Sequence, residues 1–219
     1  GSGHTVALKS DGTLWAWGAN YSGQLGDTPT FEKRSPTHIG TDNKWVNISA
    51  GGAYTTAIKS DGTLWAWGGN QYGQLGDGTT VYKSSPIQIG TDNKWVFIYA
   101  SMVHTIALKS DGTLWGWGNN ANGELGDNTG VKHGTPTQIG TDNKWISISA
   151  GWAHTIAIKS DGTLWAWGYN EQGELGDGTT ANKNSPVQIG TDNNRISIFA
   201  GGGHTIAIKS DGTLWAWGG

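Results

Sequence analysis

Apolar and polar residues alternate over short stretches of this chain, and the same alternation returns in five copies. In the second copy it predicts four β-strands, at 45–50, 54–59, 64–67 and 85–89. Within the third of these strands, Trp65 and Trp67 share one face and Leu64 lies on the other. No stretch has the helical period. We therefore expect an all-β chain in which the bulky face of one sheet packs on the smaller face of the next.

Turn residues separate these strands. Asp61-Gly62 lies between the second and third strands and predicts a hairpin with a type I′ turn. A long loop covers 68–84, and Pro86 then opens the fourth strand. Because proline cannot donate to an inner ladder, this fourth strand is expected at the edge of its sheet.

The copies share the motif His-Thr-x-Ala-x-Lys-Ser-Asp-Gly-Thr-Leu-Trp-x-Trp-Gly and begin at His4, Tyr54, His104, His154 and His204. A constant period of 50 residues made of short strands is typical of a β-propeller. The predicted fold class is thus all-β: a β-propeller of four-stranded antiparallel blades forming a single domain over 1–219. The repeats lie at approximately 1–44, 45–94, 95–144, 145–194 and 195–219.

The number of predicted strands leaves the first and last blades incomplete. The chain contains five second-to-third-strand hairpins but only four first strands and four fourth strands. Three explanations stay open: a piece of a longer propeller, a five-bladed ring with an imperfect seam, or self-association in which neighbouring chains complete one another's blades.

Several motifs carry a family resemblance. They are the Ala-Gly-x-x-His-Thr segment at 150–155, the Leu-Trp-Ala-Trp-Gly strand, the Asn-x-x-Gly-Gln-Leu-Gly-Asp loop at 20–27 and 70–77, and the proline of the fourth strand. Along its whole length the chain resembles the regulator of chromosome condensation family, which implies a propeller of the seven-bladed type. Its tryptophan- and asparagine-rich style is most similar to bacterial, often secreted members, so the resemblance implies an extracellular or cell-surface location. A secreted β-lactamase-inhibitor propeller looks like a more distant relative.

The two ends of the blades differ in how much they vary. Lys-Ser-Asp-Gly-Thr is the same in every copy, and Ile-Gly-Thr-Asp-Asn is the same in every complete one. The other end combines the turns between first and second strands with the long loops between third and fourth strands, and it changes from copy to copy. We call this end the variable loop face and its opposite the constant face.

Aromatic, basic and methionine side chains gather on the variable loop face, and such residues are enriched at interface hot spots. The hypothesis is that this face binds a protein partner, whereas the alternative is sequence drift in unconstrained loops. The candidate partner-binding residues are Tyr21, Phe31, Arg34, Tyr72, Tyr82, Met102, Lys132, Trp152 and Tyr169.

Composition removes several other classes of function. The net charge is −3 without a basic run, which argues against nucleic acid as a partner. No apolar stretch approaches the ~18 residues of a membrane span. There are no cysteines for disulfides or thiolate sites, while 37 glycines and 14 tryptophans suit tight turns and a core of a few large side chains.

The recurring polar residues have structural interpretations that we prefer to metal binding. The histidines that open the motif could form a ring of metal ligands, but we expect them to satisfy backbone groups; His38 and His133 look incidental. Asp27, Asp77, Asp127 and Asp177 could hold calcium, yet one carboxylate per loop favours Asx-turn bonding. The hairpin aspartates are expected to form turns.

The paired tryptophans are expected in the core rather than as sugar-stacking platforms. Replacing Trp115 by alanine should then cost about 3–5 kcal/mol.

No nucleophile and base stand at a catalytic spacing, so we expect neither an enzyme nor a cofactor. The interpretation is a non-catalytic binding scaffold that presents its variable loop face to a protein. Two alternatives stay open: a multivalent carbohydrate-binding lectin, and a structural repeat module of a larger surface protein or an engineered repeat protein. Nucleotide exchange or chromatin binding, suggested by the family's name, fits poorly with the mild acidity and the lack of a basic arm.

Overall fold

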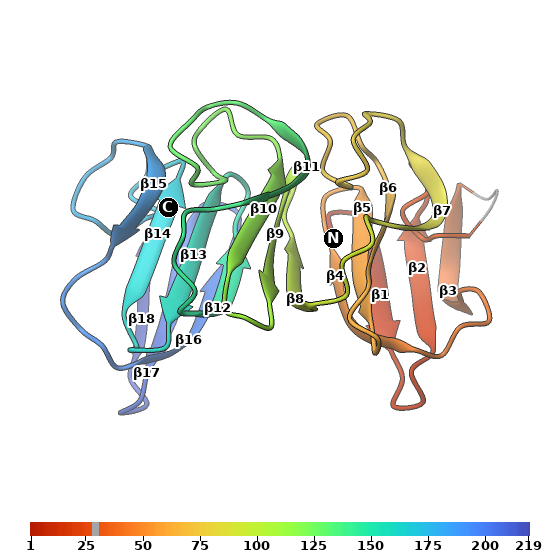
Figure 1. The fold of residues 1–219 in the computed structure, drawn as a ribbon, viewed down its shortest axis with the longest axis horizontal. Coiled ribbons are helices and arrows are strands. Elements are labelled where there is room, and N and C mark those ends of the chain that lie inside the picture. The colour runs from red at the N-terminus through yellow and green to blue at the C-terminus, as the bar shows by residue number, and fades with distance from the viewer. Residues whose placement is uncertain (28–30) are drawn as a thin grey trace.

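The computed structural model describes residues 1–27 and 31–219, whose strands form five antiparallel sheets (Figure 1). The first sheet contains β1 (His4–Leu8), β2 (Leu14–Ala19) and β3 (Glu32–His38). The second contains β4 (Trp45–Ala50), β5 (Tyr54–Lys59), β6 (Leu64–Gly68) and β7 (Lys83–Gln88). The third contains β8 (Trp95–Ala100), β9 (His104–Lys109), β10 (Leu114–Gly118) and β11 (His133–Gln138). The fourth contains β12 (Trp145–Ala150), β13 (His154–Lys159), β14 (Leu164–Gly168) and β15 (Lys183–Gln188). The fifth contains β16 (Arg195–Ala200), β17 (His204–Lys209) and β18 (Leu214–Gly218).

Each sheet is a blade whose strands pair in chain order. The second blade has the order β4-β5-β6-β7, so β7, which contains Pro86, lies at the edge as predicted. The first and fifth blades have three strands each, which confirms the unequal strand count. Among the described residues none is helical, and no helix could therefore cross a membrane.

The hairpins between second and third strands differ from the predicted type I′ turn. Gly62 N donates to Lys59 O at 2.9 Å, and Gly62 alone in this turn has a positive φ, of 80°. The turn is therefore of type I followed by a left-handed glycine, the pattern of a three-residue hairpin loop. The cause is Asp61, whose Oδ1 accepts hydrogen bonds from the Thr63 backbone and hydroxyl and holds an Asx turn. The role of the hairpin aspartates as turn formers is confirmed.

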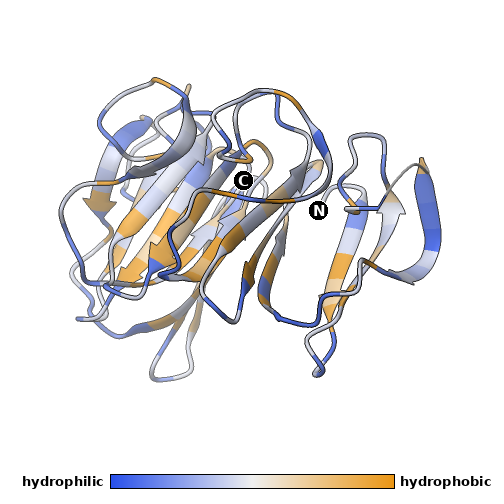
Figure 2. Cartoon of the chain, turned by 45° about the vertical axis from the view of Figure 1, so that its right-hand side comes forward, coloured by the Kyte–Doolittle hydropathy of each residue, from blue (hydrophilic) through white to orange (hydrophobic). Residues whose placement is uncertain are grey.

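Large side chains of one blade pack on small ones of the blade before it, as the alternation predicts. Trp67 is fully buried in a cluster with Leu14, Ala16 and Leu25 of the first blade. Trp117 and Trp167 repeat this contact at the next two boundaries. Figure 2 shows the hydrophobic positions gathered along the strands, with the loops mostly hydrophilic or neutral.

The first tryptophan of each pair is less buried than predicted. Trp65 is half-buried, with Trp45 edge-on at a ring-centroid distance of 5.8 Å and Lys59 Nζ 3.6 Å from its ring centroid. In the fifth blade Arg195 replaces the tryptophan of the first strand, and Trp215 becomes 49% exposed. The prediction of a core position thus holds for the second tryptophan in the three middle blades, where Trp67, Trp117 and Trp167 are fully buried. It holds only in part for the first tryptophan, because Trp65, Trp115 and Trp165 pack against the core clusters but stay half-buried beneath a lysine.

Candidate partner-binding face

The structure confirms which segments share an end of the blades. The turns after β4, β8, β12 and β16 lie at the same end as the long loops after β2, β6, β10 and β14, and the Asp-Gly hairpins lie at the other (Figure 1). In the first long loop, residues 28–30 are outside the described residues.

An asparagine holds each long loop in shape. Asn70 is buried, and its Nδ2 donates to Asp77 Oδ1 at 3.0 Å, while its Oδ1 accepts from Leu75 N. Asp77 also accepts from the backbone and hydroxyl of Thr79, and its Oδ2 pairs with Lys83 at 3.0 Å. The predicted Asx-type role is confirmed for Asp77, Asp127 and Asp177, whose carboxylates accept the backbone N–H two residues on, whereas the turn after Asp27 lies outside the described residues. The loops therefore form a fixed frame on which other side chains vary.

His133 is not incidental, contrary to the prediction. It lies in β11 at the position that Lys83 holds in β7, and its Nε2 is 2.6 Å from Asp127 Oδ2. It therefore takes the place of the lysine against the loop aspartate. His38 lies 5.3 Å from Trp15 between ring centroids and covers that ring in the first blade.

The motif histidines join one blade to the next. The Nε2 atoms of His4, His104 and His154 lie 2.9, 3.1 and 3.1 Å from threonine hydroxyls of the following blade. Tyr54 makes the equivalent contact, because its hydroxyl donates to His104 O and lies 2.9 Å from Thr105 Oγ1. The prediction that these histidines satisfy backbone groups is thus wrong in its partner: the contact is to a side chain across the blade boundary.

Burial changes the acidity of these groups and of a nearby carboxyl. Desolvation lowers the pKa of His104 to about 3 and raises the pKa of Glu124 above its ordinary value. The pKa of Tyr54 is also raised by burial. His104 is therefore neutral at physiological pH, as an inner hydrogen-bonding group should be.

Most candidate partner-binding side chains are exposed on the variable loop face, as a binding role requires. Trp152 is 61% exposed, Tyr82 64% and Tyr72 40%. Met102 is also exposed, and the exposed Tyr21 and Phe31 lie together with ring centroids 6.0 Å apart.

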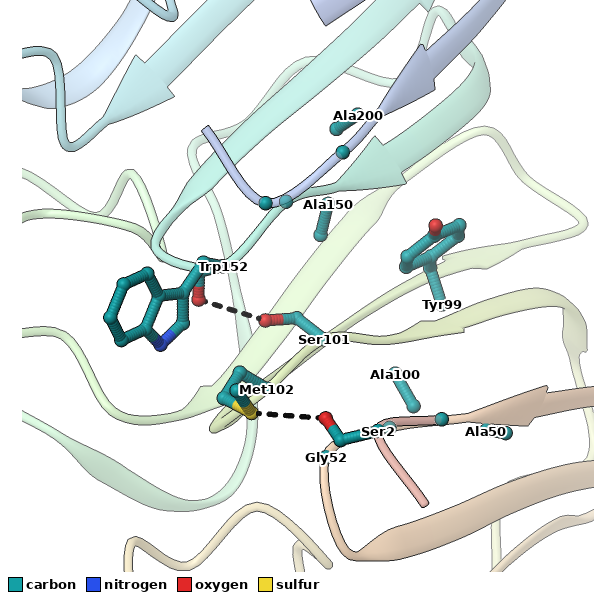
Figure 3. A pocket seen from close by; sticks show the side chains of 15 residues that line it. Ser2, Ala50, Gly52, Tyr99, Ala100, Ser101, Met102, Ala150, Trp152 and Ala200 are labelled. Carbon is teal, nitrogen blue, oxygen red and sulfur yellow. Dashed lines mark hydrogen bonds between the residues drawn. The ribbon is translucent and has the colours of Figure 1, made fainter. Parts of the chain in front are cut away.

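The structure brings some of the candidates together around two hollows. A central hollow of about 410 Å³ is lined by the turns between first and second strands, including Met102 and Trp152 (Figure 3). In that view the Trp152 indole turns away from Ala150 and Tyr99, while its carbonyl accepts from Ser101 Oγ at 3.2 Å. A second hollow of about 380 Å³, which we call the side pocket, is lined by Tyr72, Trp152 and Tyr169 together with polar residues.

The remaining candidates lie apart from both hollows. Arg34 is in β3 and pairs with Glu32 Oε1 at 2.7 Å, so its charge is already partnered. Tyr82 and Lys132 are exposed in the long loops and line neither hollow. Tyr21 and Phe31 form their pair on the first blade.

Two features were missed by the sequence reasoning. Glu124 and Glu174 replace the glutamines of the first two copies, at Gln24 and Gln74, and Glu174 lines the side pocket. On the constant face, the second residue of each first strand is exposed and apolar, namely Val46, Val96, Ile146 and Ile196. Comparing the copies residue by residue at each strand and loop position would have shown both.

Repeated four-stranded blades that pack sheet on sheet around inner strands define a β-propeller. The family model of the RCC1-like domain matches residues 1–219, and the chain belongs to this family.

Solved structures agree with this assignment. Prp20p from Saccharomyces cerevisiae is 26% identical to this chain with a TM-score of 0.88. The match covers 100% of this chain and 56% of the Prp20p chain. Yeast RCC1 (Prp20) bound to Kap60 is 25% identical with a TM-score of 0.87, over 100% of this chain and 54% of that one. Human WBSCR16, at 23% identity and a TM-score of 0.86 over 96% of this chain and 56% of that one, shares the fold. The chain thus spans about half the length of these proteins, and no curated protein matches it.

Proposed function

We propose that this propeller is a non-catalytic scaffold that holds a protein partner on its variable loop face. One observation carries the proposal: a single turn position holds Gly52, Met102, Trp152 and Gly202 in successive blades, while the frame beneath it is almost unchanged. At that position the indole of Trp152 is 61% exposed. An exposed tryptophan on a rigid turn gives a large contact area with little loss of conformational entropy, as hot spots require.

The relatives support a protein as the partner. One solved structure is of yeast RCC1 (Prp20) bound to Kap60, and another concerns the binding of Prp20p to Gsp1p and histones. Those partners belong to proteins of which this chain covers about half, so the general role is what we propose here. The non-catalytic part of the proposal is supported by the described polar side chains, because motif histidines and loop aspartates are engaged in structural hydrogen bonds.

The experiment compares affinity capture by the parent and two variants. The loop-face variant combines Trp152→Gly with Tyr82→Ser; glycine already occupies the equivalent turn position at Gly52 and Gly202. The constant-face control is Val96→Ser, which changes an exposed apolar residue at the other end. We expect one protein, identified by mass spectrometry and then purified, to bind the parent and the control and to lose affinity for the loop-face variant.

Equal affinity of that purified protein for all three would contradict the proposal. Binding that a free monosaccharide competes away would favour the lectin alternative instead, since a protein interface does not depend on a sugar.

A further inference from the structure

The side pocket contains a buried acidic residue, Glu174, and one of its carboxylate oxygens accepts no hydrogen bond from a described residue. Glu174 is 1% exposed, and its Oε2 accepts from Gln172 N at 2.9 Å. Its Oε1 accepts no hydrogen bond from any residue that the structure describes. This oxygen is not enclosed by protein, so it is open to the side pocket, where a cationic donor of a ligand can form a charge-assisted hydrogen bond with it.

The preceding blade shows how this oxygen is satisfied elsewhere. Glu124 is the equivalent residue, and its Oε2 accepts from Asn122 N at 2.7 Å. Its Oε1 accepts from Asn119 Nδ2. In the fourth blade Tyr169 replaces that asparagine, and its hydroxyl donates to Glu171 Oε2 at 3.0 Å instead. The substitution therefore leaves Glu174 without its donor and adds an aromatic ring to the pocket.

The walls of the side pocket suit a cation. Trp152, Tyr169 and Tyr72 contribute aromatic rings, and the residues that line the pocket include no Lys, Arg or His. An ammonium or guanidinium group is attracted to aromatic faces and forms strong hydrogen bonds with a carboxylate. A neutral sugar would leave the charge of the buried carboxylate uncompensated.

From this geometry we propose that the side pocket binds the lysine or arginine side chain of a protein partner, with Glu174 as its acceptor. The inference rests on the proposed protein-binding function and names the chemistry of one contact. The volume of about 380 Å³ accommodates one long side chain rather than a folded segment.

The experiment uses capped pentapeptides, Gly-Gly-Xaa-Gly-Gly, in which Xaa is arginine, lysine or norleucine. Binding is followed through the indole N–H signal of Trp152 in NMR titrations of the whole chain. We expect dissociation constants on the order of 1 mM for the basic peptides. The norleucine peptide, which has the same stem without the charge, should bind at least about tenfold more weakly.

Three variants assign the effect to Glu174. Glu174→Gln should weaken the arginine peptide at least about tenfold, and the first two copies show that the loop accepts glutamine. Tyr169→Asn should weaken it as well, by supplying the amide donor that Asn119 gives to Glu124. Glu32→Gln removes the same kind of charge on the first blade, where Glu32 pairs with Arg34 away from the pocket, and should leave binding unchanged.

Equal binding of the norleucine peptide, or equal losses in Glu174→Gln and Glu32→Gln, would overturn the proposal. If Glu174→Gln binds the arginine peptide normally while the loop-face variant loses its protein partner, the scaffold function stands and the cation pocket is wrong. If the peptides bind as expected but no protein depends on the variable loop face, the pocket stands and the scaffold function is wrong.

Discussion

His104 donates its Nε2–H to Thr155 Oγ1 across the boundary between the third and fourth blades, over a distance of 3.1 Å. The direction follows from the next bond, because Thr155 Oγ1 donates its own proton to Glu124 O at 2.8 Å. At three of the boundaries an indole also donates to a carbonyl of the preceding blade: Trp67 to Gln24 O, Trp117 to Gln74 O and Trp217 to Glu174 O, at 2.9–3.0 Å. Trp167 Nε1 has no such partner among the described residues. Each boundary between blades therefore contains a short series of buried hydrogen bonds next to its apolar contact.

Removing the threonine hydroxyl at the centre of this series of hydrogen bonds should destabilise the protein. Thr155→Val keeps the shape of the side chain but leaves a buried histidine N–H and a carbonyl without their partner. We expect the free energy of unfolding to fall by about 1–3 kcal/mol, measured by urea denaturation. Thr5→Val is the matched control, because Thr5 holds the same motif position and is exposed in the first blade. Equal losses of unfolding free energy in the two variants would show that these hydrogen bonds between blades contribute nothing to stability.

Acid should destabilise the propeller through its buried histidines. Desolvation lowers the pKa values of His4, His104 and His154 to about 4, about 3 and about 4. In the unfolded chain a histidine has a pKa of about 6.5, so the unfolded state binds protons first as the pH falls. Stability should be full above about pH 6.5 and should decrease below it by about 1.4 kcal/mol per pH unit for each histidine. The raised pKa of Glu124 acts in the opposite sense, because its carboxyl becomes easier to bury when protonated.

One substitution isolates the histidine contribution. Tyrosine already takes this role at Tyr54, where Gly51 leaves room beside the ring, and Gly151 gives the same room beside His154. His154→Tyr should therefore fold and should reduce the slope of stability against pH by about a third between about pH 6.5 and about pH 4. Urea denaturation across that range measures the slope, and an unchanged slope would mean that other groups dominate it.

Local sequence patterns predicted the strands and turns of each blade, but they did not predict the contacts between blades. The strand bounds at 45–50 and 54–59 match β4 and β5 because a two-residue period and turn residues act within one segment. The type I′ assignment was wrong because Asp61 binds Thr63 through its side chain, which a dipeptide rule ignores. The role of His104 and the open oxygen of Glu174 depend on residues in other strands, loops or blades, and only coordinates place those together.

The two tryptophans of one strand should differ in their contribution to stability. Trp117 is fully buried, and its Nε1 donates to Gln74 O, so Trp117→Ala should cost about 3–5 kcal/mol. Trp115 is half-buried beneath Lys109, whose Nζ lies 3.4 Å from its ring centroid, and its replacement by alanine should cost less. Thermal and urea unfolding give the order, and a larger loss at Trp115 would contradict the burial seen here.

The outer face of the fifth blade should promote self-association of this chain. Leu214 is 68% exposed, although Leu164, its equivalent in the fourth blade, is fully buried under the tryptophan of the next blade. The first blade presents its own tryptophans, Trp15 and Trp17, which are only half-buried. We expect sedimentation at increasing concentration to show species above the 23.1 kDa of one chain. Leu214→Lys should shift that equilibrium back towards the single chain, whereas Val96→Lys on the constant face should not. A parent that sediments as one chain at every concentration would show that these two faces do not pair.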